Sequence, residues 1–483
     1  MNSLHLRNSL CKIVKGQVFT EKEILNFYSV DASLYQVMPK AVVIPKNEID
    51  IINVIKFAKK NKISVTVRGA GTGLVGNSLN SGIIIDLKEL DSVTITKNSV
   101  IVQPGVLKGN LDKILENKQK FFPPNPSIGP YCSVGGIIGN NASGSRTLKY
   151  GSAIDQISEI TFIDGNGNMV TLPSDKKIGK KILRLSQQLD LDKFPKTSKN
   201  SCGYRLDKIK TIGDTHKILA GSEGTLGIIV SAKLIVKNMP IKKLLFIIEY
   251  DSLQTLAKDC HFIKETNPSA IEFVDRQTLR NFNVKFNKNT NSLLFVEYDS
   301  DLEIIAKRLR KSIHSKLVTK IKSENEIKKW WKFRDRALSY SLKSIKPEYR
   351  VPHIIEDAAV PLEKLGSLFS IIQKINQKFQ TKVVMYGHAG NGNIHVRIIS
   401  KRKKIKSLEK IAKEYFDSVI KLGGTITAEH GDGIARSEFV KNQYGEKNYK
   451  IFRELKKVFD PNRILNPGKI TTHKNQLKII EKF

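Results

Sequence analysis

The apolar positions in the first half of the chain follow two different periods. Continuous or alternating apolar runs predict strands at 41–44, 64–68, 83–87, 93–95 and 100–102. Apolar residues three and four positions apart predict helices at 48–60 and 107–117. The pair Lys97-Asn98 would join the last two strands as a hairpin. This order of elements favours a small α+β lobe over a doubly wound parallel sheet.

The pattern changes after Lys237. Long apolar runs predict strands at 244–250 and 293–298, and 302–315 predicts an amphipathic helix. Antiparallel strands separated by helices would form a domain that caps the substrate. A chain of 483 residues exceeds the size of a single hydrophobic core. We therefore expect two domains, a cofactor domain at 1–237 with its core at about 28–237, and an α+β substrate domain with an antiparallel sheet at 238–483.

The charge balance is strongly positive. The 81 Lys and Arg residues outnumber the 46 Asp and Glu residues, which gives a net charge of +35. Such a balance occurs in proteins that bind nucleic acids or anionic membranes. The lysines are scattered, with one true cluster at 401–406 (KRKKIK), so we expect no nucleic-acid partner. Contact with the inner-membrane surface fits the charge better. No apolar run approaches the roughly 20 residues needed to span a bilayer.

The four cysteines, Cys11, Cys132, Cys202 and Cys260, lie far apart and form no CxxC pair. This spacing argues against a disulfide framework and against an iron–sulfur cluster held by this chain. We expect a cytoplasmic protein.

In the segment 68–86, RGAGTGLVGNSLNSGIIID, Gly69, Gly71, Gly73 and Gly76 lie close together just after a predicted strand. Because glycine tolerates a positive φ, consecutive amides in such a loop can point inward and bind a pyrophosphate. Thr72 and Ser78 add hydroxyl donors. The segment lacks the GxGxxG, helix and acidic residue of a nicotinamide site. The alternative is an ordinary glycine turn between strands, and two further segments of the same kind weigh against it.

The second segment, 123–151, contains Gly135, Gly136 and Gly139 and then several Asn and Ser residues. Close backbone approach and neutral polar groups suit a flat, polar-edged heterocycle and a phosphate. The third segment, 221–228 (GSEGTLGI), leads into a predicted strand at 229–236.

In this order, RGAGTGLVG, GGIIGNNASG and GSEGTLG resemble the FAD domain of the vanillyl-alcohol-oxidase and p-cresol-methylhydroxylase superfamily. The resemblance implies an FAD-binding domain of two α+β lobes. Members that attach flavin covalently carry His near the position of Thr72, so the resemblance implies non-covalent FAD. The residues that it places at the cofactor are Arg68, Gly69, Ala70, Gly71, Thr72, Gly73, Ser78, Pro104, Gly105, Ser133, Gly136, Gly139, Asn140, Asn141, Ser143, Gly144, Gly221, Glu223, Gly224, Gly227 and Ile228.

Three of the nine histidines lie in two short glycine-rich segments of the second half. His388 and His395 flank the turn of GHAGNGNIHVR, and Glu429 precedes His430 in AEHGDG. Two imidazoles and a carboxylate suit Zn²⁺, Mn²⁺ or Fe²⁺ with a position open to substrate. The alternative is that these are ordinary loop histidines, and their concentration in two segments weighs against it.

Together these two segments resemble the D-2-hydroxyacid dehydrogenase branch of the superfamily, which includes D-lactate, glycolate and D-2-hydroxyglutarate dehydrogenases. The resemblance places a divalent metal on His388, His395 and Glu429. It makes His430, as a neutral imidazole, the general base.

Two further segments carry the same resemblance. WKFR ends in Arg334 and resembles the WxxR segment whose arginine binds the substrate carboxylate through a bidentate fork. The alternative is a surface arginine on a lysine-rich helix. The closing segment 460–469 resembles the one that places an asparagine, here Asn466, near the flavin.

The chain departs from the branch at several positions. Asn391 stands where Asp is usual, and Ile355 and Glu356 stand where Lys and Tyr are common before the Asp of a strand resembled by 354–361. Arg397 stands where a smaller polar residue is common. Strand alternation puts Arg397 on the same face as His395, where its cation would bind a second substrate carboxylate. The alternative is an ion pair between Arg397 and a surface acid.

The resemblance implies FAD-dependent oxidation of a D-2-hydroxyacid, with D-lactate, D-2-hydroxyglutarate and glycolate as candidates. Electrons would then pass to a quinone, a cytochrome or an electron-transfer flavoprotein, and a homodimer or a separate iron–sulfur subunit would fit the branch. A non-redox alkylglycerone-phosphate-synthase-like flavoenzyme and a basic nucleic-acid-binding module are the alternatives. Because the flavin loops and the metal loops lie in different halves, we expect chelation to leave FAD bound.

Overall fold

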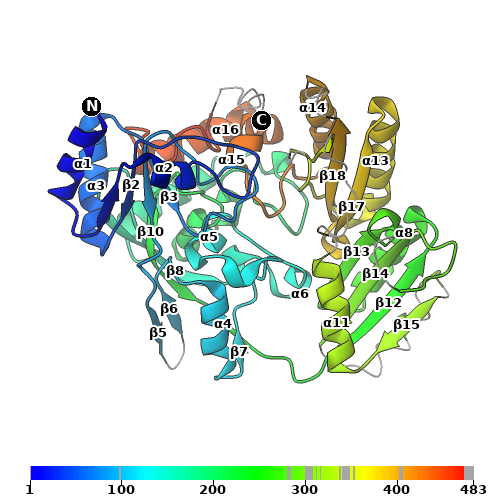
Figure 1. The fold of residues 1–483 in the computed structure, drawn as a ribbon. Helices are drawn as coiled ribbons and strands as arrows, with labels where there is room; N and C mark the ends of the chain where they lie inside the picture. The colour runs from blue at the N-terminus through cyan, green and yellow to red at the C-terminus, as the bar shows by residue number, and fades with distance from the viewer. Residues whose placement is uncertain are drawn as a thin grey trace.

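The structure is a computed structural model. It describes residues 2–96, 99–279, 284–299, 308–309, 311, 313–315, 317–336, 339, 349–351, 354–401 and 406–472. The chain forms an α+β protein with one large group of elements from each half of the sequence (Figure 1).

The first lobe is built on a four-stranded sheet with the order β1-β2-β4-β3. β2, β4 and β3 are parallel, and β1 pairs antiparallel with β2. The apolar faces of α1 and α3 complete its core, which includes Leu10, Ile51 and Ile83. The bounds are α1 Ser3–Cys11, β1 Gln17–Phe19, α2 Lys22–Tyr28, β2 Ala41–Ile44, α3 Glu48–Asn61, β3 Val65–Arg68 and β4 Ile83–Asp86.

The second lobe is built on a five-stranded antiparallel sheet with the order β5-β6-β10-β8-β9. A small pair, β7 with β11, lies beside α4. The bounds are β5 Val93–Ile95, β6 Val100–Val102, α4 Lys108–Glu116, β7 Lys120–Phe121, α5 Val134–Gly139, α6 Thr147–Tyr150, β8 Ile157–Ile163, β9 Met169–Leu172, α7 Lys176–Ser186, β10 Ile228–Leu234 and β11 Lys237–Asn238.

The second half contains a seven-stranded sheet with the order β15-β12-β14-β13-β17-β18-β16. Alternate residues of its strands pack against α11 on one face, and the other residues pack against α8, α13 and α14 (Figure 1). The bounds are β12 Leu244–Tyr250, α8 Leu253–Lys264, β13 Ala270–Asp275, α9 Arg276–Leu279, β14 Ser292–Tyr298, β15 Val318–Ile321, α11 Glu324–Asp335, β16 Tyr349–Arg350, α13 Leu365–Phe379, β17 Lys382–His388, β18 Asn393–Lys401 and α14 Lys406–Lys421.

The last described segment returns to the first half. After α15 (Gly433–Arg436), α16 (Val440–Phe459) lies along the top of the first and second lobes in Figure 1. Leu465 then forms a parallel bridge with Val65, and both belong to the core of the first lobe. The amide of Asn466 donates to the carbonyl of Val65 at 2.7 Å. The C-terminal segment therefore packs in the core of the first lobe, although it follows the seven-stranded sheet in sequence.

The helices and strands that the sequence pattern predicted at 41–117, 229–236, 244–250 and 293–298 agree with the structure within one or two residues, and the other elements were not predicted. One expectation is wrong: 354–361 contains no strand, and two isolated bridges join Ala359 to Asn393 and to Thr425. More than half of the predicted helix at 302–315 lies outside the described residues, as do the turn at 97–98 and most of the basic cluster at 401–406. Within the described ranges, no helix is both long and apolar enough to cross a membrane.

Candidate active site

One large cavity of about 1200 Å³ lies where the two halves meet. Its walls combine all three glycine-rich segments with residues of α11, β17, β18 and the loop before α15. Sixteen of the residues predicted at the cofactor line it: Gly69, Ala70, Gly71, Thr72, Gly73, Ser78, Pro104, Ser133, Gly136, Gly139, Asn140, Ser143, Gly144, Glu223, Gly224 and Gly227. The predicted metal, base and carboxylate residues line the same cavity: Arg334, His388, His395, Arg397, Glu429 and His430.

The first glycine loop has the backbone of an anion nest. Gly71 has a φ of +68°, and a Cβ at Gly69 would lie 2.0 Å from Oγ of Ser133. Among the described residues, no hydrogen-bond acceptor is paired with the amides of Ala70, Gly71, Thr72 or Gly73. Closely spaced amides that have no acceptor within the described part of the chain suit a pyrophosphate. The loop therefore fits FAD.

Six predicted cofactor residues do not line the cavity: Arg68, Gly105, Asn141, Gly221, Ile228 and Asn466. Three of them form hydrogen bonds to backbone carbonyls of other segments instead. Arg68 donates to the carbonyl of Val30, and Asn141 donates to the carbonyl of Asn200. Asn466 donates to the carbonyls of two residues from different loops, Asn77 at 2.9 Å and Glu223 at 2.6 Å.

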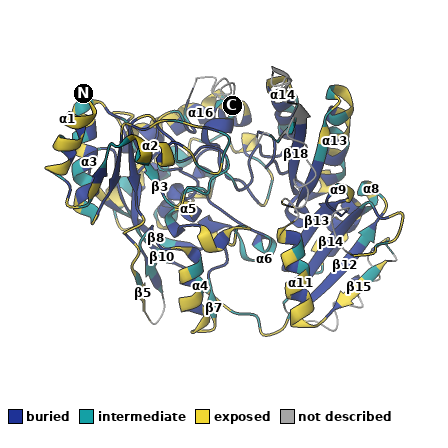
Figure 2. Cartoon of the chain, viewed as in Figure 1, coloured by how far each residue is buried: buried dark blue, intermediate teal, exposed yellow. Residues whose placement is uncertain are grey.

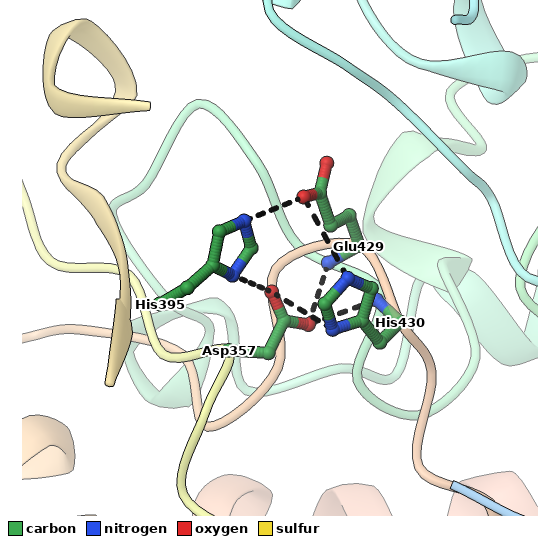
Figure 3. Close-up of side chains that lie close together, drawn as sticks. All are labelled: Asp357, His395, Glu429 and His430. Carbon is green, nitrogen blue, oxygen red and sulfur yellow. Dashed lines mark hydrogen bonds and ion pairs between the residues drawn. The ribbon is translucent and has the colours of Figure 1, made fainter. Parts of the chain in front are cut away.

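The three histidines converge on one carboxylate oxygen. Oε1 of Glu429 lies 2.9 Å from Nε2 of His388, 3.1 Å from Nε2 of His395 and 3.9 Å from Nε2 of His430. Figure 3 shows His395 and His430 on either side of Asp357, with Glu429 above them. The β17–β18 hairpin supplies His388 and His395, because its turn brings the two ends of the GHAGNGNIH segment together.

Each of these rings has an acceptor on its other nitrogen. Nδ1 of His388 lies 2.6 Å from Glu272, Nδ1 of His395 lies 3.1 Å from the carbonyl of Glu356, and Nδ1 of His430 lies 3.0 Å from the Glu356 carboxylate. A ring that donates through Nδ1 presents the lone pair of Nε2 to the cavity. This outer layer of acceptors is typical of histidines that bind metals. The donor set therefore fits a divalent cation.

Asp357 lies beneath this group but has a different role. Asp357, His395, Glu429 and His430 offer ligand atoms within 4.8 Å of one another. However, Oδ2 of Asp357 accepts the backbone N–H groups of 428, 429 and 430 at 2.8–3.0 Å. Asp357 therefore shapes the loop that presents Glu429 and His430, whereas His388, His395 and Glu429 have cavity-facing donor atoms.

The acids around His430 favour its charged form. Burial alone would lower the pKa of His430, but Asp357 and Glu356 outweigh burial and raise the pKa to about 9. The neutral imidazole that the resemblance implies is expected beside a bound cation, so it stays a prediction. A divalent cation beside Glu429 would offset the acids and favour the neutral ring.

Two buried arginines share one tyrosine. The guanidinium of Arg334 lies over the ring of Tyr386 at 5.8 Å, and Arg397 donates to the Tyr386 hydroxyl through Nε and Nη2, both at 3.2 Å. Arg334 is also paired with Glu272. The surface alternatives for both arginines are wrong, because Arg334 is 3% exposed and Arg397 is 1% exposed. Nε of Arg334 and Nη1 of Arg397 have no hydrogen-bond partner among the described residues.

Sequence reasoning missed the supporting acids and one lysine. Glu272 pairs with both Arg334 and His388. Glu356 pairs with Arg436 as well as His430, and Lys199 donates to Glu429 at 2.9 Å. One signal existed for Glu272: it lies in the apolar run AIEFVD, where all six residues are buried. Lys199 offered no local signal.

Comparison with known proteins agrees with this architecture. Residues 39–173 match the family described as "FAD binding domain", and residues 240–470 match "FAD linked oxidases, C-terminal domain". The chain carries both domains of the FAD-linked oxidases. The protein is therefore an oxidoreductase that uses FAD as its cofactor. The three glycine-rich segments had suggested this cofactor.

Similar proteins have related names. The chain is 29% identical to glycolate oxidase subunit GlcD of Bacillus subtilis, covering 92% of this chain and 91% of the relative. It is 27% identical to D-lactate dehydrogenase of Anaerostipes hadrus, with 89% of each chain covered. It is 28% identical to D-2-hydroxyglutarate dehydrogenase of Escherichia coli, covering 92% of this chain but 49% of the relative. The chain thus spans about half the length of the D-2-hydroxyglutarate dehydrogenases that it matches.

A solved structure of alkyldihydroxyacetonephosphate synthase has the same fold. The TM-score is 0.68, and the alignment covers 97% of this chain and 85% of the synthase at 16% identity. At this identity the likeness concerns the fold alone.

Proposed function

We propose that this FAD-linked enzyme oxidises a D-2-hydroxyacid to the 2-oxoacid, in a reaction assisted by a divalent metal. The observation that carries the proposal is the convergence of three histidine Nε2 atoms on Oε1 of Glu429, inside the cavity that the flavin loops line. The names of the relatives, which include D-lactate and D-2-hydroxyglutarate dehydrogenases, support the substrate class.

The bound groups would supply two kinds of chemistry. FAD would supply the hydride acceptor. His388, His395 and Glu429 would hold a divalent cation (Zn²⁺, Mn²⁺ or Fe²⁺ by its ligands), which would lower the pKa of the substrate hydroxyl. Glu272 and the carbonyl of Glu356 fix the ring orientations of the two histidine ligands.

His430 would accept the hydroxyl proton at Nε2. Its Nδ1 is directed at Glu356, so Nε2 is the nitrogen that faces the cavity. Glu356 stabilises the imidazolium once the proton has moved. Arg334 would bind the substrate carboxylate, because its Nε is a buried donor without an internal partner. Glu272 holds the Arg334 guanidinium in place.

Arg397 would bind a second anionic group of the substrate. Its Nη1 is a second buried donor for which the described part of the chain offers no hydrogen-bond partner, and Tyr386 lies between it and Arg334. This arrangement favours a 2-hydroxydicarboxylate over D-lactate or glycolate, since an unpaired buried cation is costly.

The reduced flavin needs an electron acceptor. We propose a quinone, a cytochrome, an electron-transfer flavoprotein or a separate iron–sulfur subunit. The word "subunit" in the name of the Bacillus subtilis relative supports the idea of a partner chain. A cytoplasmic location with contact at the inner-membrane surface remains our expectation from the positive charge, with a homodimer as one assembly.

The proposal is tested by anaerobic reduction of the bound flavin. The purified yellow protein is mixed with D- and L-enantiomers of 2-hydroxyacids, and the flavin absorbance is followed. We expect bleaching by at least one D-2-hydroxyacid and none by its L-enantiomer. A flavin that stays oxidised with every acid, in protein shown to contain metal, would overturn the proposal.

A further inference from the structure

The two carboxylate oxygens of Glu429 have different hydrogen-bond partners. Oε1 faces the histidine Nε2 atoms, as described above. Oε2 accepts hydrogen bonds from Nζ of Lys199 at 2.9 Å and from the hydroxyl of Ser143. One oxygen is thus directed into the cavity, and the other is fixed by two donors.

Both donors come from the flavin-binding half of the chain. Ser143 lies in the second glycine-rich segment and lines the cavity between Asn140 and Gly144. Lys199 is fully buried and does not line the cavity, and its Nζ also donates to Oδ1 of Asn393 at 3.4 Å. Lys199 therefore acts through Glu429 and not on the substrate.

The neighbours of Lys199 bind both loops that carry the predicted metal ligands. Ser198 accepts a hydrogen bond from Asn391 at 2.8 Å, which lies between His388 and His395. The hydroxyl of Ser201 donates to the carbonyl of Ala428 at 2.9 Å, and the amide of Gly203 donates to Asp432 at 2.8 Å. We call 198–203 the connecting segment, because it joins the flavin half to both loops.

We infer that FAD and the divalent metal bind cooperatively, with Ser143 and Lys199 as the positioning residues that link them. The inference rests on the metal site of the proposed function. FAD packed against the Ser143 segment would fix the hydroxyl that holds Oε2, and a fixed Oε2 keeps Oε1 directed at the histidines. By linkage, the metal must then strengthen FAD binding by the same factor. The sequence led us to expect only that chelation leaves FAD bound; the coupling predicts that FAD is then held more weakly.

The experiment measures FAD retention in the holoenzyme with and without metal. Protein stripped with a chelator and protein reloaded with Zn²⁺ are each diluted, and free FAD is followed by its fluorescence. We expect the dissociation constant of FAD to be at least about fivefold lower with Zn²⁺, the lower end of typical coupling between sites. Ser143→Ala and Lys199→Met should each bring this ratio towards one.

Matched variants from the same segments serve as controls. Ser145→Ala removes a neighbouring hydroxyl that also lines the cavity, and Lys196→Met removes an exposed lysine near the connecting segment. Both variants should keep the wild-type ratio of the FAD dissociation constants without and with Zn²⁺. A variant that weakens FAD binding equally in both states leaves this ratio unchanged. Folding is checked by flavin content before chelation.

The possible outcomes distinguish a failure of the FAD–metal coupling from a failure of the proposed function. Wild-type protein that binds Zn²⁺ but shows equal FAD affinity in both states would overturn the coupling and leave the proposed function intact. Ratios that persist in both Ser143→Ala and Lys199→Met would overturn the assigned residues. Protein that binds no Zn²⁺ at all would overturn the metal site and the coupling together.

Discussion

Oε1 of Glu272 lies 2.6 Å from Nδ1 of His388, and this contact joins the substrate end of the site to its metal end. The other carboxylate oxygen of Glu272 is paired with Arg334. Burial would raise the pKa of Glu272, but Arg334 and His388 outweigh burial and lower it, so the residue carries a charge. One buried acid thus orients both the proposed carboxylate anchor and a proposed metal ligand.

Glu272→Gln should weaken metal binding. The amide keeps the shape of the side chain but removes the charge that orients His388, and loss of such a partner typically lowers metal affinity by about 10- to 100-fold. Zn²⁺ affinity, measured by competition with a chromophoric chelator, checks this. Glu297→Gln is the matched control, because Glu297 is equally buried on the neighbouring strand and pairs with Arg146 instead. Equal Zn²⁺ affinity in wild type and Glu272→Gln would contradict the assignment.

Arg397→Met should change the choice of substrate. Losing one charge-assisted contact costs about 1.5–3 kcal/mol, or about one to two decades in kcat/KM. We expect that loss for D-2-hydroxyglutarate and little change for D-2-hydroxyvalerate, which has five carbons but no second carboxylate. Lys332→Met, which removes an exposed cation from the cavity rim, should not alter the ratio of the two substrates. An equal effect of Arg397→Met on both substrates would leave Arg334 as the only proposed anchor.

FAD should be released by acid. Thr72 occupies the loop position discussed above, and its hydroxyl lies 3.5 Å from Sγ of Cys132. Burial raises the pKa of the Cys132 thiol, so this side chain is a poor nucleophile towards the flavin. After precipitation with acid, the yellow colour should remain in the supernatant. Colour retained in the washed pellet would show a covalent link.

Lys469 should make stability depend on pH above neutrality. Nζ of Lys469 donates to the carbonyl of Leu79 at 2.7 Å, and burial lowers its pKa to about 8 although Glu223 opposes the shift. Between about pH 8 and the ordinary lysine pKa of 10.5, the unfolded chain binds a proton that the folded chain does not. The free energy of unfolding should therefore rise with pH there, by up to about 3 kcal/mol from this residue.

Denaturant unfolding of wild type and Lys469→Met at pH 8 and pH 10 measures the difference. The variant should lose the rise attributed to Lys469, whereas Lys40→Met, at an exposed position, should keep it. Parallel curves for wild type and Lys469→Met would contradict the prediction.

Much of the fold could be predicted because its signals are local. The alternation in 93–102 and the helical period in 48–60 both depend on neighbours within a few residues. The strand that the resemblance implied at 354–361 is absent, because Asp357 accepts a hydrogen bond from the amide of Glu429 and Glu356 accepts one from Arg436. These long-range contacts fix an irregular backbone that no local pattern indicates.

The site was predictable to the extent that its residues share short segments. His388 and His395 are seven residues apart on one hairpin, and Glu429 is next to His430, so motifs exposed all four. Lys199 and Glu272 are separated from Glu429 and His388 by more than a hundred residues, and no periodicity reports such contacts. Their charges are visible in the sequence, but their partners are set by tertiary packing.

The connecting segment also limits how this fold can be recombined. A chimera made by joining the first 237 residues of this chain to the later residues of a relative would replace both metal loops but keep 198–203. Its hydrogen bonds to Asn391, Ala428 and Asp432 would then have to match foreign loops. Exchanging 198–203 together with the second half would keep these contacts native. The segments that must be exchanged together are therefore discontinuous in sequence. They include 198–203, which precedes the seven-stranded sheet, as well as the second half.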